Sequence, residues 1–155
     1  MAGGEDEGPE DLDRVESALD CFRQGHNCAQ AILVTFGPRY GLPPEMALRL
    51  AAPFGGGMGG LGEVCGAVSA GLMVLGLAKG FTRAEDREAK EEMYRLAREF
   101  VGLFEERNGS ALCRKLIGCD IHTPEGVEEA RGKGVFRSLC PRFVRDAAEI
   151  LSRLA

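Results

Sequence analysis

Four cysteines stand where the sequence predicts the first turns of four different helices. They are Cys28, Cys65, Cys113 and Cys140. The positive end of a helix dipole and the free backbone N–H groups of a first turn stabilise a thiolate and lower its pKa. Thiolates attack disulfide bonds and also bind soft metal ions. If the four helix ends converge, the fold builds one site for redox or metal chemistry.

The residues beside these cysteines are what place them at helix starts. Asn27, a preferred N-cap residue, directly precedes the first of the four, and Ser110 is a candidate N-cap three residues before the third. Pro141 favours the first helical position, which makes Cys140 itself a candidate N-cap. The second cysteine of the four follows a glycine-rich stretch and opens an apolar helix.

The alternative for any single cysteine is burial as a small hydrophobic side chain. For Cys21 and Cys119 we expect this packing role, because one lies beside the apolar stripe of the first helix and the other closes a turn after Gly118. The joint placement of the other four at helix starts favours a functional interpretation over packing.

The glycine-rich stretch covers residues 55–62, and six of these eight residues are glycine. Gly57, Gly59 and Gly62 satisfy the GxGxxG pattern of dinucleotide-binding proteins and are candidate cofactor-binding residues. That pattern predicts a nucleotide site only when a strand precedes it, and residues 51–54 do not have the composition of a strand. An anion- or nucleotide-binding module is therefore the less favoured function, and we expect the glycines to expose the thiol of Cys65 to its reaction partner.

The composition of the 155-residue chain is that of a globular protein, with 45% hydrophobic and 28% charged residues. The net charge of −5 and the absence of a basic cluster argue against nucleic acid as a partner. The longest uncharged run, residues 64–78, is shorter than the roughly 20 apolar residues of a membrane span, so we do not expect an integral membrane protein. No secretory signal is visible, and we expect a cytoplasmic location, where cysteines are more often catalytic or metal-binding than permanently cross-linked.

Apolar residues recur at spacings of three and four, and no stretch alternates with period two, which predicts an all-α fold. We expect residues 1–9 to be a disordered lead-in. Residues 10–155 are predicted to form a single domain, a bundle of about six or seven helices around a central, buried, Gly/Ala-rich helix over residues 64–78. In that helix Gly71 and Gly76 are predicted to allow close packing.

Three details of the other helices follow from the same pattern. The longest helix is predicted to start at Thr82, with Glu85 completing a capping box. A short helix after Pro43 is predicted to turn Met46, Ala47 and Leu50 inward. A turn of helix is predicted to begin at Thr123, and an amphipathic helix over residues 136–154 is expected to close the chain.

Four segments together resemble the bacterial and archaeal C_GCAxxG_C_C family, which is named for four cysteines and a CGAxxG motif. The segments are Gly25–Ala31, Cys65–Gly71, Cys113–Gly118 and Cys140 with the helix that follows it. The resemblance covers nearly the whole chain after the first ten residues. It implies a redox or metal-linked role, and it places the four family cysteines on the four residues at the predicted helix starts.

Two chemistries compete for these four cysteines. In thiol redox chemistry, as in a thiol-based oxidoreductase, Cys65 is the candidate attacking thiol and another cysteine resolves the mixed disulfide; the sequence does not choose among the possible pairings. Alternatively, the four thiolates hold an iron–sulfur cluster or zinc, although their separations of 37, 48 and 27 residues lack the short CxxC pairs common in such sites. The substrate, the redox partner and the oligomeric state are left open.

Overall fold

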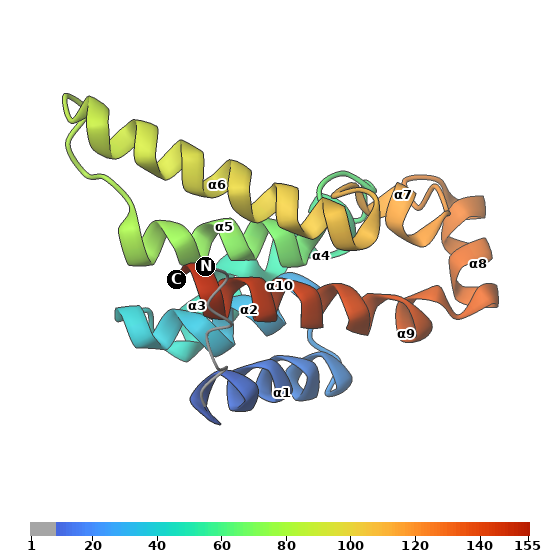
Figure 1. Cartoon of the computed structure of the whole chain (residues 1–155). Coiled ribbons are helices and arrows are strands. Elements are labelled where there is room, and N and C mark those ends of the chain that lie inside the picture. The colour runs from blue at the N-terminus through green and yellow to red at the C-terminus, as the bar shows by residue number, and fades with distance from the viewer. Residues whose placement is uncertain (1–8) are drawn as a thin grey trace.

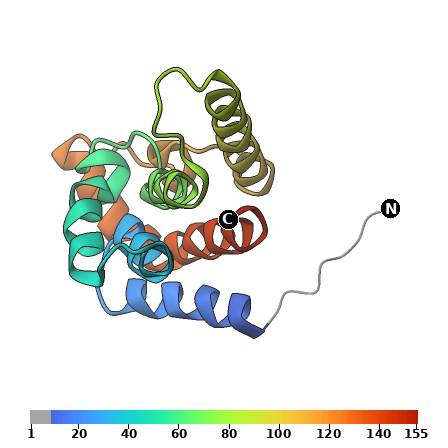
Figure 2. The same cartoon turned by 90° about the vertical axis from the view of Figure 1, so that its left-hand side faces the viewer.

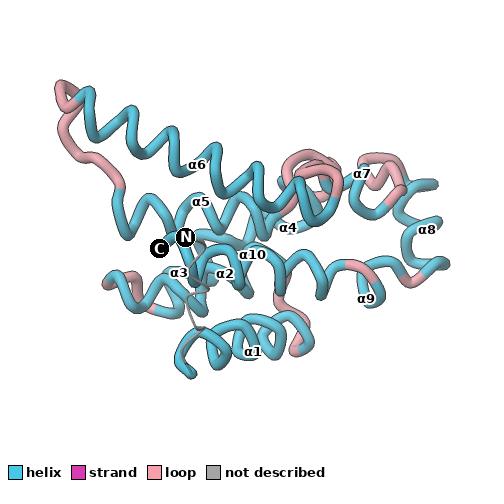
Figure 3. Tube along the Cα trace, in the orientation of Figure 1, coloured by secondary structure: helices cyan, strands magenta, loops and turns pink. Residues whose placement is uncertain are grey.

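The computed structural model describes residues 9–155, and helices make up most of that range (Figure 1 and Figure 3). The α-helices are α1 (Pro9–Arg23), α2 (Cys28–Phe36), α3 (Pro44–Ala51), α4 (Gly55–Met58), α5 (Gly66–Lys79), α6 (Arg87–Asn108), α7 (Cys113–Ile117), α8 (Pro124–Lys133), α9 (Val135–Ser138) and α10 (Cys140–Leu154). Two 3-10 helices cover Gly37–Tyr40 and Ala52–Phe54. The all-α prediction is confirmed. The structure has more segments than the six or seven predicted, because α4, α7 and α9 are single turns.

Helix α5 lies at the centre of the fold, as predicted. It packs against α2, α6 and α10, and Figure 2 shows these helices arranged around its axis. Half of its residues are buried, among them Ala67, Ala70 and Val74. The largest fully buried side chains of the surrounding core include Phe36, Phe100 and Phe104. The N-terminal end of α5 is therefore held in place on several sides, which fixes the geometry of whatever binds there.

Two of the predicted helix starts are confirmed in detail. The Asn27 side chain accepts a hydrogen bond from the backbone N–H of Gln30, and the Gln30 side chain accepts one from the backbone N–H of Asn27, which is a capping box. At the start of α8, the Thr123 hydroxyl accepts a hydrogen bond from the backbone N–H of Gly126. The first of these caps fixes the position of Cys28.

Other local predictions were wrong. Helix α6 starts at Arg87 and not after Thr82, because the Asp86 carboxylate caps it by accepting a hydrogen bond from the N–H of Ala89. In α3, Met46 is 56% exposed and Leu50 is 52% exposed, so only the predicted burial of Ala47 is confirmed. The short helix α3 lies at the edge of the fold and has too few neighbours to cover all of its apolar residues.

The predicted N-terminal lead-in lies outside the described residues except for Pro9, the first residue of α1. Among residues 9–155, no helix combines the length and the apolar character needed to cross a bilayer. The described part of the chain also contains no strand. A single antiparallel bridge joins Val64 to Leu112, and it connects the segment before α5 to the segment before α7.

Gly71 and Gly76 of α5 have different surroundings, although close packing was predicted for both. A Cβ atom at Gly71 would lie 2.3 Å from the ring of Phe100, which is fully buried. A Cβ atom at Gly76 would meet nothing within 4 Å. The packing prediction is confirmed for Gly71 and wrong for Gly76.

We expect Gly71→Ala to lower the free energy of unfolding by about 1–3 kcal/mol, because the added methyl group overpacks the core. In contrast, Gly76→Ala should raise it by up to about 1 kcal/mol, because alanine has the higher helix propensity and the space is open. Urea denaturation of the two variants checks this. A stabilising Gly71→Ala substitution would contradict the close approach of α6 to α5.

Candidate functional site

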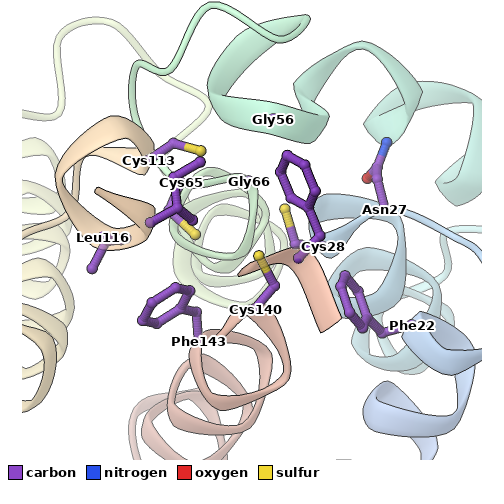
Figure 4. A pocket seen from close by; sticks show the side chains of 12 residues that line it. Phe22, Asn27, Cys28, Gly56, Cys65, Gly66, Cys113, Leu116, Cys140 and Phe143 are labelled. Carbon is purple, nitrogen blue, oxygen red and sulfur yellow. The ribbon is translucent and has the colours of Figure 1, made fainter. Parts of the chain in front are cut away.

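The four cysteines at the helix starts line one cavity of about 170 Å³ (Figure 4). They come from four elements, since Cys28, Cys113 and Cys140 are the first residues of α2, α7 and α10 and Cys65 is the N-cap of α5. The rest of the lining is mostly apolar and includes Phe22, Leu116, Ile117, Phe136 and Phe143. The structure therefore brings together four side chains that are spread over more than a hundred residues of sequence.

Two of the cysteines are fixed relative to each other by backbone pairing. The N–H of Cys65 donates to the carbonyl of Ala111 at 2.8 Å, and the N–H of Cys113 donates to the carbonyl of Glu63 at 2.6 Å. The Val64–Leu112 bridge lies between these bonds. This short antiparallel contact holds the start of α5 beside the start of α7, so both thiols face the same cavity.

The sulfur of Cys28 lies against the first turn of α5. A Cβ atom built on Gly66 would lie 2.6 Å from this sulfur, so only glycine leaves room for it. The sulfur accepts hydrogen bonds from the Cys65 thiol and from backbone N–H groups, including those of Gly56 and Ala67. The Cys65 hydrogen bond makes the largest contribution, and together these donors lower the pKa of Cys28 to about 7 against the opposing effect of burial.

The hydrogen bond that stabilises the Cys28 thiolate has the opposite effect on its donor. It raises the pKa of the Cys65 thiol well above its ordinary value, and burial and the charge of Cys28 act in the same direction. Only 5% of Cys65 is exposed. The prediction that Cys65 is an acidic, approachable thiol was therefore wrong. Cys28, which is less deeply buried, is the ionised member of the pair.

The two remaining cysteines of the cavity are neutral at pH 7. Burial, followed by the charge of Cys28, raises the pKa of Cys113 to about 11. The same two effects and the charge of Cys113 raise the pKa of Cys140 to about 12. A helix start alone was expected to acidify all four thiols. Desolvation outweighs it at these two, and α7, with five residues, has only a small dipole.

A sequence comparison identifies the family. Residues 26–154 match the family described as "Putative redox-active protein (C_GCAxxG_C_C)". The chain belongs to this family. Searches of curated proteins and of solved structures gave no match. The match covers all four cysteines that line the cavity of this C_GCAxxG_C_C protein.

The motif segment of this C_GCAxxG_C_C protein covers residues 65–71 and begins with Cys65, Gly66 and Ala67. The motif residue with the clearest role is Gly66, because its missing side chain lets the Cys28 sulfur reach the backbone N–H groups of α5. The motif therefore supplies Cys65 and also makes room for the sulfur of Cys28, which lies outside the motif.

The glycine-rich stretch forms a compact left-handed turn. Residues 56–60 all have positive φ, including Met58 at 68°, a conformation that glycine adopts at little cost. The amides of Gly59, Gly60 and Gly62 donate to carbonyls within the turn, so they are not free to bind a phosphate. The turn also covers the cavity through Gly56. We expected the turn to expose the Cys65 thiol. This expectation was wrong, because only 5% of Cys65 is exposed.

Gly57 and Gly62, two of the three candidate cofactor-binding glycines, lie in close contact with α7 or the segment before α5. A Cβ atom at Gly57 would lie 2.6 Å from the backbone nitrogen of Glu63 and 2.7 Å from the Cβ atom of Cys113. At Gly62 it would lie 3.2 Å from the Cβ atom of Arg114. Gly59 has no comparably close contact. These contacts favour a packing role for the glycines over a nucleotide site.

Cys21 and Cys119 do not line the cavity. Cys21 lies in a separate, more polar hollow of α1 and α2, and burial raises its pKa. Cys119 is 3% exposed and directly follows Gly118, the C-cap of α7. Both positions agree with the packing role expected for them, and both cysteines can serve as controls in thiol chemistry.

The cysteine-ligated metal site was the alternative use of the same four thiols. In the described range 9–155, no group of three or more His, Cys, Asp or Glu side chains is arranged to hold a metal ion. The donor set in this arrangement therefore does not fit a four-thiolate centre. All six cysteines are free thiols.

The aromatic and backbone components of the site were missed by sequence reasoning. Phe22, Phe136 and Phe143 enclose the cavity, and the Gly56 N–H stabilises the Cys28 thiolate. The phenylalanines were visible only as members of apolar helix stripes, and nothing distinguished the face that lines a cavity from the face that fills the core. The glycine pattern predicted a turn, but it did not indicate that the Gly56 N–H contacts the Cys28 sulfur.

The pKa of Cys28 should depend on a donor at position 65. We expect Cys65→Ala to raise the pKa of Cys28 by about one to two units, because it removes a hydrogen bond to a charged group. Cys65→Ser keeps a donor and should leave the pKa near 7. The pH dependence of Cys28 alkylation measures both values, and equal pKa values in the two variants would contradict the hydrogen bond.

The raised pKa of Cys140 should weaken the protein at alkaline pH. Above pH 9 the thiol ionises in the unfolded chain but stays protonated in the folded one, so the free energy of unfolding falls as pH rises. We therefore expect the destabilisation caused by Cys140→Ala to be about 1–2 kcal/mol smaller at about pH 10.5 than at pH 8. Urea denaturation at the two pH values checks this, and a difference that does not change with pH would contradict burial of a neutral thiol.

Proposed function

We propose that this protein carries out thiol–disulfide exchange, with Cys28 as the attacking thiolate and Cys65 as the resolving thiol. The observation that carries the proposal is the direct hydrogen bond from the Cys65 thiol to the Cys28 sulfur, in a cavity that also stabilises the charge on Cys28. A thiol with a pKa near the ambient pH is the best attacking group for this reaction. The family description as a redox-active protein supports the same chemistry.

The reaction transfers two electrons in two steps. The Cys28 thiolate attacks one sulfur of a substrate disulfide, a Cys28–substrate bond forms, and the other half leaves as a thiolate that takes up a proton. Cys65 then loses its proton and attacks the Cys28 sulfur, which forms a Cys28–Cys65 disulfide and releases the second substrate thiol. The substrate disulfide is reduced and the cysteine pair is oxidised. An external dithiol reduces the pair again.

The contacts of Cys65 give the two steps an order. In the resting state, its hydrogen bond to the Cys28 thiolate and the nearby negative charge keep Cys65 protonated. Once Cys28 is part of a mixed disulfide, it carries no charge, and both of these effects disappear. The pKa of Cys65 then falls toward the value set by burial alone. The resolving thiol thus becomes a better nucleophile only after the attacking thiol has reacted.

Trapping the intermediate tests the proposal. Reduced wild-type protein treated with a small disulfide should contain a Cys28–Cys65 disulfide, found by alkylation and peptide mass mapping. The Cys65→Ala variant should instead retain the substrate half on Cys28, because no resolving thiol is present. Cys119→Ala is the matched control and should behave as wild type. Resolution by another cysteine in wild-type protein would overturn the assigned pair.

A further inference from the structure

The cavity around the Cys28 sulfur is small. Its volume of about 170 Å³ is close to that of an apolar protein cavity of about 150 Å³ known to bind benzene. Aromatic rings from α1, α9 and α10 and the glycine turn enclose it (Figure 4). A substrate that reaches the sulfur inside this space must therefore be of about benzene size, or present a part of that size.

Apart from the Cys28 thiolate, which loses its charge when it attacks a disulfide, the cavity offers no partner for a charged group. None of its lining residues is acidic or basic, and Asn27 is the only one with a polar side chain other than a thiol. Both ends of the Asn27 amide are already used, because its oxygen accepts from the Gln30 N–H and its nitrogen donates to the Ala52 carbonyl. The basic side chains Arg23 and Arg137 line a neighbouring hollow and not the cavity.

We infer that the cavity selects small, uncharged, apolar disulfides, such as dialkyl disulfides, and excludes charged ones. This substrate class rests on the exchange reaction proposed above. In the mixed disulfide an ionised group inside the cavity would have lost its water, and the charge of Cys28, the counter-charge the cavity holds, would be gone, which is strongly unfavourable. An alkyl group instead gains contact with the phenylalanine and leucine side chains. The products are two alkyl thiols and the Cys28–Cys65 disulfide.

Three symmetric disulfides, each with two methylene or methyl carbons next to each sulfur, test this selectivity. They are diethyl disulfide, which is uncharged, dithiodipropionate, which is a dianion, and cystamine, which is a dication. The rate at which each oxidises the reduced protein is divided by its rate with a free thiol, which removes differences in intrinsic reactivity. We expect diethyl disulfide to exceed both charged reagents by about tenfold or more on this scale.

The comparison of both charge signs separates exclusion by the cavity from long-range attraction. The net charge of −5 should favour the approach of cystamine over that of the dianion, so a low relative rate for cystamine cannot come from that field. The preference for diethyl disulfide should persist in about 0.5 M sodium chloride, where long-range interactions are screened. Equal relative rates for the three reagents would overturn the inference.

A cavity-filling variant gives a second test. Leu116→Trp should lower the relative rate with diethyl disulfide by about tenfold, because the larger side chain occupies the cavity that Leu116 lines. Thiolate ultraviolet absorbance should still show Cys28 ionised, which checks that the site has folded. Leu77→Trp is the matched control, because Leu77 is 41% exposed and lies outside the cavity. Equal rates in the two variants would overturn the inference.

The outcomes distinguish this inference from the proposed function. If all three reagents form the Cys28–Cys65 disulfide at the relative rates of a free thiol, the exchange reaction stands and only the selectivity is wrong. If none of them forms that disulfide while Cys28 is ionised, both the reaction and the selectivity are wrong.

Discussion

Cys28→Ala should lower the rate of thiol–disulfide exchange at pH 7 by about tenfold or more. With a pKa of about 7, half of the Cys28 thiols are ionised at this pH. The neighbouring Cys113, with a pKa of about 11, is ionised to only about one part in ten thousand. Each Cys113 thiolate is a stronger nucleophile by about 40–100-fold, because nucleophilicity rises with pKa. The shortage of thiolate still outweighs this gain. Cys28→Ala also removes the charge that raises the pKa values of Cys65 and Cys113, so these thiols recover part of the rate, and the loss is smaller than the roughly 100-fold that the wild-type ratios give.

Stopped-flow measurement of exchange with diethyl disulfide checks the prediction. Cys113→Ala and Cys119→Ala are the controls: the first removes a neutral thiol of the cavity and the second a buried thiol outside it. Both should retain at least about half of the wild-type rate. A loss in Cys113→Ala as large as in Cys28→Ala would mean that the two thiols attack as a unit, which contradicts the assignment of Cys28 alone.

The position of the four cysteines could be predicted from sequence, because it depends on local signals. Asn27 caps α2 as expected, and the residues around Cys65 and Cys140 place both at helix starts. The Ser110 signal was less accurate. Its hydroxyl accepts a hydrogen bond from the Leu112 N–H, but α7 begins only at Cys113, the residue after Leu112. In each case neighbouring residues carried enough information to place the thiol within a residue or two of a helix end.

The order of the thiol pKa values could not be predicted, because it depends on contacts between distant segments. The thiolate of Cys28 is stabilised by donors from Gly56, Cys65 and Ala67, which are far from it in sequence. A helix start indicates only the local dipole. It does not show that the first turn of α5 stabilises a sulfur from α2, or that the thiol at that turn serves as a donor.

The same limit explains the errors in the glycine assignments. A glycine inside a helix is either required by a neighbouring side chain that packs closely against it or merely lowers the stability of the helix. The sequence does not distinguish these two cases. Gly71 faces the ring of Phe100, whereas Gly76 faces open space. In the glycine turn, the pattern resembled a phosphate-binding loop, but the amides bond within the turn and the missing Cβ atoms make room for neighbouring segments.

Gly57→Ala should lower the free energy of unfolding by about 2–5 kcal/mol. Two costs add at this position. Its φ of 69° places an alanine in the left-handed region, at about 1–2 kcal/mol. The new Cβ atom would also lie 2.6 Å from the backbone of Glu63 and 2.7 Å from Cys113, so backbone must move, at about 1–3 kcal/mol.

Gly60→Ala is the matched control, because it carries only the first cost. Its φ is 79° and its Cβ atom would meet nothing within 4 Å, so we expect a loss of about 1–2 kcal/mol. Urea denaturation gives both free energies, and thiolate absorbance shows whether Cys28 keeps its low pKa when the turn moves. If both variants lose the same free energy, backbone strain alone explains the glycines, and the turn is not pressed against Cys113. A larger loss in Gly57→Ala instead means that the glycines are required because the turn packs directly on the segment that holds a thiol of the cavity.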